Sequence, residues 1–422
     1  AVAPAPEEVR PVGMHHAISD QWSFGVLFRE IRALYQGIEL PELNHQYGDF
    51  AAWQREWLQT DTMRASLAYW QEKLAGVKPL ELPTDKPRPR MTTSHGRTIH
   101  AQLRPGLDET LQRLSRTLQV TPFAVMFAAY NVLLHRYARV TDIAVGVPIA
   151  TRPHPALEQL IGSFLNVLVH RNDLSAASTF EELVAIVQDT ALDASAHQAV
   201  PFERVVEVLD LPRDTSRLPL VQVLFNVANA PVPSDLLPGI QAEMLMLDRT
   251  AAQFELSLHV HGNAVFLEYN TDLFEDGTAE RLLDEYCQLL EQVATNPQLP
   301  LAALRVASDT DRAQLAQWNA TERAYRTDVT LVDLLVEQAE RTPDAIAVSA
   351  PDGMYTYAQL LRRAQAIALE LRGLGVAEGD RVAVVLPRGR DLPAALLGVL
   401  GSGAAYVPLD PHHPVSRLEY AL

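Results

Sequence analysis

The spacing of apolar residues changes once along this chain, at residues 305–328, and this change constrains the fold more than any other feature. Before it, helical and strand-like patterns are mixed. Within it, apolar periodicity fades after Pro297 and Pro300 lead into a polar run. After it, strand-like and helical segments alternate regularly. The sequence therefore predicts a first domain over residues 1–304, a linker over 305–328 and a second domain over 329–422.

Both domains are predicted to be of the α/β type. In the first, the patterns predict strands at 8–16, 143–149, 164–171, 220–228, 254–261 and 264–270, and helices at 22–35, 47–75, 106–118, 122–137, 179–195, 201–209 and 276–294. In the second, they predict helices at 330–341, 357–373 and 391–400, and strands at 345–350, 381–386 and 404–409. The strand–helix alternation of the second domain predicts a parallel sheet with right-handed crossovers.

Composition excludes several classes of function. The net charge of −17 argues against nucleic-acid binding, which needs clustered Lys and Arg. The single cysteine, Cys287, rules out an internal disulfide and fits a helical core position in a reducing compartment. No apolar run approaches the ~18 residues that span a bilayer, and residues 1–30 lack a signal-peptide pattern. We expect a cytoplasmic protein without membrane or nucleic-acid partners.

The strongest candidate site is the segment MHHAISD, which starts at Met14. If His15 and His16 end a strand, their side chains point to opposite faces, so only one lines a given cavity. An imidazole exchanges protons near neutral pH, which suits acid–base work. Asp20 lies past the turn, at the start of the next helix, where a carboxylate also suits the helix dipole.

Two other interpretations of this segment compete with a catalytic one. A metal site formed by His15, His16 and Asp20 is disfavoured, because neighbouring strand residues diverge and no other ligand cluster is visible. A purely structural pair of histidines is the commoner situation when a sequence offers nothing more. A second pair, His412 and His413, lies between two prolines with no aspartate after it, and we assign it no catalytic role.

The context of the segment decides between these interpretations. MHHAISDQWS resembles the M-H-H-x-I-S-D-G-W-S signature of nonribosomal peptide synthetase condensation domains, which chloramphenicol-acetyltransferase-like acyltransferases share in shorter form. Further family motifs follow in the family's order: YGDFAAW at 47–53, IGSFLN at 161–166 with the later Arg171, HQAVPFE at 197–203 and RDTSRLPL at 213–220. LPTDKPRPR at 82–90 resembles the family's connection between two lobes. The resemblance implies a two-lobed, chloramphenicol-acetyltransferase-like α/β fold.

The second domain resembles an adenylation domain. YTYAQL at 355–360 and LGSGAAYVPLD at 400–410 resemble that family's first two motifs, although on the residues alone both have structural roles. The chain starts with Ala1 and ends at Leu422, before the phosphate loop and catalytic lysine that the family carries later. We therefore expect a condensation domain without its amino-terminal part and an incomplete adenylation domain without adenylation activity. ATP and Mg²⁺ would serve only a complete adenylation domain.

The resemblance also implies a reaction. In this family an upstream donor and a downstream acceptor peptidyl carrier domain bring acyl groups on phosphopantetheine arms into a tunnel between the lobes. The acceptor's α-amine attacks the donor thioester and forms an amide. The second motif histidine, His16, is the expected catalytic residue, with His15 in support. His16 acts either as a general base or by hydrogen bonding to the amine and the tetrahedral intermediate, and the sequence leaves both roles open.

The resemblance assigns supporting roles to other residues. Asp20 is expected to hold the motif loop by an ion pair with Arg152 rather than to contact substrate. Asn166 is expected to line the tunnel near the acceptor. Trp22 and Phe24 are expected to be ordinary core residues. No residue of the chain is expected to bind a metal or a cofactor.

One motif position departs from the family. Gln21 stands where the family has glycine. Glutamine adds bulk and removes the freedom to adopt positive φ. Turnover is expected to fall if this side chain faces the pantetheine arm, and to be unchanged if it points outward.

Alternative functions share the same motifs. An epimerisation domain also carries H-H-x-x-x-D-G, but the direct run into an adenylation domain favours condensation. An inactive recruitment platform typically has a damaged histidine motif, and a stand-alone acyl-CoA acyltransferase has no adenylation domain. NVLVHRNDLS at 166–175, with AHQAVPFERVVEVL at 196–209, resembles condensation domains that join an L-configured donor to an L-acceptor.

Overall fold

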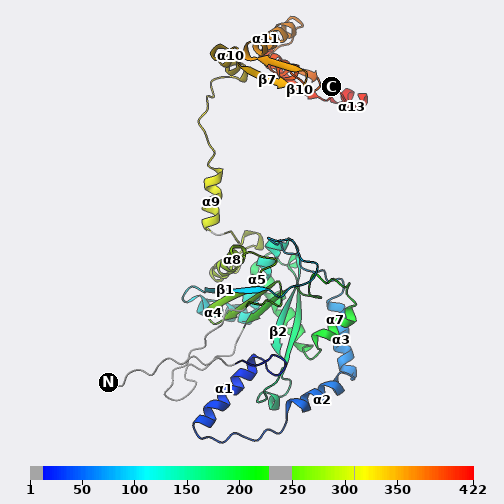
Figure 1. The fold of residues 1–422 in the computed structure, drawn as a ribbon, viewed down its shortest axis with the longest axis vertical. Helices are drawn as coiled ribbons and strands as arrows, with labels where there is room; N and C mark the ends of the chain where they lie inside the picture. The colour runs from blue at the N-terminus through cyan, green and yellow to red at the C-terminus, as the bar shows by residue number, and fades with distance from the viewer. Residues whose placement is uncertain (1–12, 228–249, 308) are drawn as a thin grey trace, which may run out of the picture. The chain divides into compact units, whose positions relative to one another are not determined.

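The chain forms two compact units, Ala1–Gln317 and Trp318–Leu422. The computed structural model describes residues 13–227, 250–307 and 309–422 (Figure 1). Part of the strand predicted at 8–16 lies outside the described residues. Residues 13–16 form no strand, because no strand in the described part of the chain pairs with them.

A six-stranded mixed sheet is the framework of the first unit. In spatial order its strands are β1 (Gly96–Gln102), β6 (Ala264–Asn270), β5 (Leu256–His261), β4 (Val223–Val227), β2 (Asp142–Ala150) and β3 (Leu165–Asp173). The β5–β4 and β4–β2 pairs are parallel, and the other pairs are antiparallel. The β2–β3 pair aligns Ala150 with Leu165, so the ends of these strands lie side by side.

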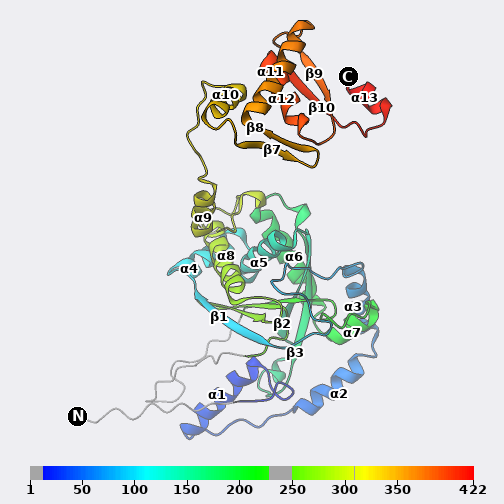
Figure 2. The same cartoon turned by 45° about the horizontal axis from the view of Figure 1, so that its top comes forward.

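Helices cover both faces of this sheet. The helices described up to residue 319 are α1 (Gln21–Tyr35), α2 (Tyr47–Trp57), α3 (Asp61–Lys73), α4 (Leu107–Leu118), α5 (Pro122–Ala138), α6 (Phe180–Ala196), α7 (Phe202–Leu209), α8 (Asp276–Thr295) and α9 (Asp309–Asn319), and only some of them pack on the sheet. Helices α5, α6 and α8 lie on one face, and α3 and α7 pack together on the other (Figures 1 and 2).

The alternation of side chains along β2 separates two hydrophobic cores. Ile143, Val145 and Val147 belong to the core under α5 and α8, whereas Ala144 packs with the residues of α3 and α7. Successive strand residues point to opposite faces, and both faces of this strand are buried. The sheet is therefore the middle layer between two sets of helices.

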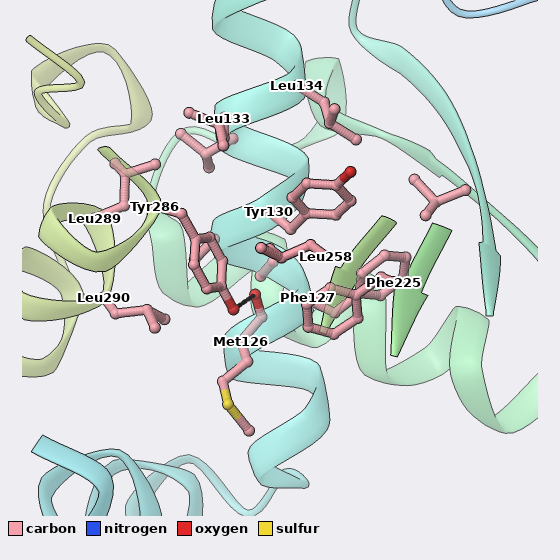
Figure 3. Packing of buried hydrophobic residues seen from close by; sticks show 14 of the residues in the cluster. Met126, Phe127, Tyr130, Leu133, Leu134, Phe225, Leu258, Tyr286, Leu289 and Leu290 are labelled. Atoms are coloured by element: carbon pink, nitrogen blue, oxygen red, sulfur yellow. Dashed lines mark hydrogen bonds between the residues drawn. The ribbon is translucent and has the colours of Figure 1, made fainter. Parts of the chain in front are cut away.

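Helix α5 runs through the larger core and is buried on nearly all sides. It begins where Thr121 caps the backbone N–H of Ala124, with Pro122 in the first turn, a combination typical of helix starts. Figure 3 shows Tyr286 of α8 reaching toward this helix, where its hydroxyl donates a 3.1 Å hydrogen bond to the Met126 carbonyl oxygen. Phe127 stacks on Phe225 of β4, which joins helix and sheet.

One sequence expectation for helices was wrong, and one helix lies in a segment for which none was predicted. The pattern predicted as one helix over 47–75 forms α2 and α3, because Thr60 caps the Met63 N–H and starts a new helix. The predicted linker 305–328 contains α9. From residue 311 to its end this helix is almost entirely exposed, so its sequence lacks the apolar periodicity that reveals a packed helix.

The second unit has smaller sheets. Its elements are α10 (Leu331–Arg341), β7 (Ile346–Ala350), β8 (Gly353–Thr356), α11 (Tyr357–Gly373), β9 (Arg381–Val385), α12 (Asp391–Ser402), β10 (Ala405–Leu409) and α13 (Val415–Ala421). Strands β9 and β10 are parallel, as the alternation predicted. Strands β7 and β8 form an antiparallel hairpin, which the sequence pattern did not reveal because β8 has only four residues.

A polar cluster lies within the larger core. His170 of β3 and Asn131 of α5 are buried, and Asn131 accepts a 3.3 Å hydrogen bond from Asn172. Burial, with a smaller contribution from Lys73, lowers the pKa of His170 to about 4. The folded protein therefore holds this imidazole neutral.

This burial predicts a loss of stability in mild acid. The ordinary pKa of His170 is 6.5 and the folded value is about 4, so the unfolded chain binds the proton more readily between these values. The free energy of unfolding should fall by about 3 kcal/mol as the pH drops through this window. Urea unfolding at pH 7 and pH 4.5, with His170→Leu as the comparison, measures this effect. Equal losses in both proteins would contradict the assignment.

Candidate active site

The histidine motif forms a tight turn instead of the predicted strand end. The Ile18 N–H donates to the His15 carbonyl oxygen at 3.0 Å, and the Ser19 hydroxyl donates to the same oxygen at 3.2 Å. His15 and His16 are exposed, and Ser19 and Asp20 are buried. The turn therefore exposes both imidazole rings to solvent, while the two residues at its end are buried.

The hydrogen bonds of the turn place the two imidazoles in opposite tautomers. His16 Nδ1 lies 2.8 Å from the Ser19 carbonyl oxygen, which can only accept, so Nδ1 carries the proton. His15 Nδ1 lies 3.0 Å from the Ala17 backbone N–H and must accept. In the neutral rings, His16 therefore keeps its lone pair on Nε2, whereas His15 carries its proton there.

Asp20 ends the turn and begins helix α1. Its Oδ1 accepts from the backbone N–H and the hydroxyl of Ser23, each at 2.8 Å, and the Asp20 N–H donates to the Ser23 hydroxyl in return. This reciprocal pairing is a capping box. The carboxylate also lies at the positive end of the helix dipole, as predicted.

The same carboxylate binds Arg152, two residues beyond the end of β2. The two guanidinium nitrogens donate to Asp20 Oδ2 at 2.9 Å and Oδ1 at 3.0 Å. The side chains are 4% and 2% exposed, so the pair is buried. Burial alone would raise the pKa of Asp20, but hydrogen bonds from Arg152 and Ser23 outweigh it and hold the pKa below 3.8. The carboxylate stays charged at neutral pH.

The loop before β3 closes around this ion pair. The Phe164 N–H donates to Asp20 Oδ2 at 3.1 Å. The Ser23 hydroxyl oxygen accepts from the Gly162 N–H at 3.1 Å and lies 3.0 Å from the Gly162 carbonyl oxygen. Tyr47 of α2 donates its hydroxyl to the Ser163 carbonyl oxygen at 2.9 Å. Three motifs far apart in the sequence thus pack together around the Asp20–Arg152 pair.

Gly162 is required by this close packing. A Cβ atom there would overlap the Tyr47 ring and lie 2.9 Å from Cε2 of Phe164. The Tyr47 and Phe164 rings pack edge to face with centroids 5.1 Å apart, and Phe164 is buried, so an added methyl would disturb this ring pair. The sequence motif gave no role to this glycine, because its contact partner is over a hundred residues away.

Asn166, which the resemblance places near the acceptor, makes four hydrogen bonds to backbone groups. Its amide nitrogen donates to the carbonyl oxygens of Gln198 and Val200 at 2.9 and 2.8 Å. Its amide oxygen accepts from the N–H groups of Val167 and Phe202 at 2.9 and 3.0 Å. The side chain therefore uses both functions to fix the loop before α7 against the start of β3.

Gln21, the departure from the family motif, is the first residue of α1 and is exposed. It lies within a right-handed helix and is not among the described non-glycine residues with positive φ. This position therefore makes no use of a glycine's freedom to adopt positive φ.

The crossover segment 82–90 is fastened to the sheet. Arg88 forms a two-pronged ion pair with Glu255, just before β5, at 2.6 and 2.9 Å. Arg217 of the RDTSRLPL motif lies 3.2 Å from Glu81 and 3.0 Å from Asp214. The sequence did not point to Glu255, because no motif contains it.

Metal and membrane sites find no clear support in the described residues. Residues 13–227, 250–307 and 309–422 contain no group of three or more His, Cys, Asp or Glu side chains placed to hold a metal ion. Over the same ranges, no single helix has the length and apolar composition needed to cross a membrane. Only α4 and α5 together, bent by 103°, meet that criterion.

Known protein families and curated proteins are similar to this chain in sequence. The condensation domain family matches residues 10–316, and the AMP-binding enzyme family matches 335–422. A linear gramicidin synthase of Brevibacillus parabrevis is 40% identical over 423 residues, covering 97% of this chain and 8% of that protein. The chain spans 6–12% of the length of the curated relatives it matches.

Solved structures are similar to this chain in fold. Holo-AB3403, a four-domain nonribosomal peptide synthetase bound to AMP and glycine, is 28% identical with a TM-score of 0.77, covering 96% of this chain and 32% of that one. The X-domain in its complex with OxyB from teicoplanin biosynthesis is 29% identical with a TM-score of 0.61, covering 70% of this chain and 69% of that one.

The fold, the histidine motif and these matches define an acyltransferase-type enzyme domain that forms amides. The chain belongs to the condensation domain family of nonribosomal peptide synthetases, and the start of an AMP-binding adenylation domain follows the condensation domain.

The ion pair makes a prediction about stability. Asp20→Ala leaves the buried Arg152 without its partner, so the free energy of unfolding should fall by about 3–5 kcal/mol. Glu207→Ala is the matched control, because the Arg204–Glu207 pair is 49% and 67% exposed and should contribute less than about 1 kcal/mol. Urea unfolding of both variants checks this. Losses of similar size would show that Arg152 does not depend on Asp20.

The tight packing of Gly162 makes a second prediction. Gly162→Ala should destabilise the domain by about 1–3 kcal/mol, because the added methyl overlaps Tyr47. Gly25→Ala in α1, where nothing lies within 4 Å of the new Cβ, should be neutral or stabilising by up to about 1 kcal/mol. Thermal unfolding separates them, and a harmless Gly162→Ala would mean that the loop has room to move.

Proposed function

We propose that this condensation domain joins a carrier-bound acyl or peptidyl thioester to the α-amine of a carrier-bound aminoacyl group, with His16 as the catalytic residue. The observation that carries the proposal is the hydrogen bond from His16 Nδ1 to the Ser19 carbonyl oxygen. It leaves the Nε2 lone pair without a partner among the described residues, on an exposed ring that a substrate amine can reach.

The reaction follows from this lone pair. An α-amine with a pKa near 8 is mostly protonated at neutral pH, so it must lose a proton before or during attack. The amine nitrogen bonds to the thioester carbonyl carbon, the carbon–sulfur bond breaks, and the proton passes from nitrogen to Nε2 and on to the departing thiolate. A general base and a positioning hydrogen-bond acceptor use the same lone pair, and orientation contributes to the rate in both cases.

The partners follow from the reaction. The thioesters arrive on phosphopantetheine arms of an upstream donor and a downstream acceptor carrier domain. ATP and Mg²⁺ belong to adenylation, whose domain starts after the linker that we assign to 305–328, between a condensation domain over 1–304 and an adenylation domain over 329–422. Similarity to linear gramicidin synthase supports a peptide antibiotic or related secondary metabolite as the product. The motif at 166–175 supports an L-configured donor and an L-acceptor.

Two related functions are less well supported. The structural similarity to an X-domain solved in complex with OxyB suggests a recruitment platform as one alternative. The intact pair of histidines, with the second tautomer set for accepting a proton, favours catalysis instead. Epimerisation would use the same motif, but the adenylation segment that follows favours condensation.

The test uses the protein with separately loaded donor and acceptor carrier domains and follows dipeptidyl product by mass spectrometry. The His16→Ala variant lacks the acid–base residue, so it should form product at least about 100-fold more slowly than the wild type. The matched control is His412→Ala, which changes a histidine bonded to Asp410 in the second unit and should leave the rate unchanged.

Each alternative has its own outcome in this assay. A recruitment platform would form no dipeptide even in the wild type. An epimerisation domain would invert the donor's configuration without forming an amide. Full-speed condensation by His16→Ala would rule out the proposed role of this ring.

A further inference from the structure

Two aromatic rings flank the guanidinium of Arg152. Its central carbon lies 4.3 Å from the centroid of the Phe164 ring and 5.5 Å from that of the Trp22 ring. Both distances fall within the range in which a cation is attracted to a ring face. Phe164 is 2% exposed, but Trp22 is 42% exposed. One ring therefore belongs to the interior, and the other faces solvent.

Trp22 is not the core residue that the sequence suggested. It occupies the first turn of α1, two residues after Asp20. Its indole N–H donates a 2.8 Å hydrogen bond to the Glu158 carbonyl oxygen, which sets the direction of the ring. Although the tryptophan itself is exposed, Arg152 beneath it is only 4% exposed. Phe24 is half-buried, so it is not a full core residue either.

This cover matters because the strength of an ion pair depends on its access to water. A pair that water reaches is screened and contributes little, whereas a dry pair holds its geometry strongly. Arg152 donates to Asp20 through two nitrogens and has a buried Nε without a hydrogen-bond partner among the described residues. If one side of this guanidinium became exposed, water could hydrogen-bond to Nε, and the contact with Asp20 would weaken.

We propose that Trp22 is a positioning residue of the condensation site, whose ring keeps the Asp20–Arg152 pair dry and thereby holds the turn that aims His16. The turnover part of this inference rests on the proposed function. The structural part does not, since it concerns only the ring and the guanidinium.

Trp22 also has a simpler structural role, which must be distinguished from the proposed one. Through its indole N–H, Trp22 ties down the loop that contains Glu158, and that hydrogen bond alone would give it structural value. Two substitutions separate the roles. Trp22→Phe keeps a ring face over Arg152 and loses the N–H, whereas Trp22→Leu keeps an apolar side chain and loses both the ring and the N–H.

The first measurement is hydrogen exchange at Arg152 Nε–H, followed by NMR with ¹⁵N-labelled arginine in the full chain. Trp22→Leu should speed exchange by at least about 10-fold and remove the ring-current shift of this proton, and Trp22→Phe should stay near wild type. Trp53→Leu is the matched control, because Trp53 is also 42% exposed but stacks on Phe50 and Trp57 instead. Unchanged exchange in Trp22→Leu, or equal acceleration in all variants, would overturn the proposal.

The second measurement is turnover by the same variants with loaded carrier domains. Trp22→Leu should lower kcat about 5- to 10-fold, while KM for the acceptor carrier stays unchanged. This factor corresponds to the free energy of a partly buried cation–π contact. Trp22→Phe should lose less than about 2-fold. Equal losses in both variants would assign Trp22 to the Glu158 tether. If the NMR result holds while His16→Ala keeps its rate, only the proposed function fails.

Discussion

The buried contact between Asp20 and Arg152 is the interaction on which the site depends. The Asp20 carboxylate accepts from Arg152, from Ser23 and from the Phe164 backbone, so it joins helix α1, the end of β2 and the start of β3. Removing two charges from water is costly, and such pairs are weak evidence for stability. The value of this one lies in geometry, because the carboxylate binds donors from all three elements at once.

The remaining motifs work through the same contact. Gly162 lets the loop come close to Ser23 and Tyr47, and Asn166 then binds the next loop to β3. The sheet supplies the rigid base, since the paired ends of β2 and β3 lie side by side, with Arg152 just beyond β2 and Asn166 near the start of β3. A short turn with exposed imidazoles can therefore hold a defined tautomer, although it has no strand of its own.

Motif order in the sequence predicted the family, the fold class and the pairing of Asp20 with Arg152, because these rest on local patterns and on resemblance. Roles that depend on distant partners were missed. The sequence did not reveal the four backbone partners of Asn166, and Trp22 looked like core because aromatic residues usually are. The turn at His15 was mistaken for a strand end, since apolar alternation does not reveal whether a pairing partner exists.

The central claim is that the turn fixes His16 with its proton on Nδ1 and its lone pair on Nε2. ¹⁵N NMR of ring-labelled histidine, at a pH where the imidazole is neutral, tests this directly, because protonated and bare ring nitrogens differ widely in chemical shift. The account predicts a protonated Nδ1 and a bare Nε2 for His16, and the reverse for His15. A neutral His16 that carries its proton on Nε2 would contradict it.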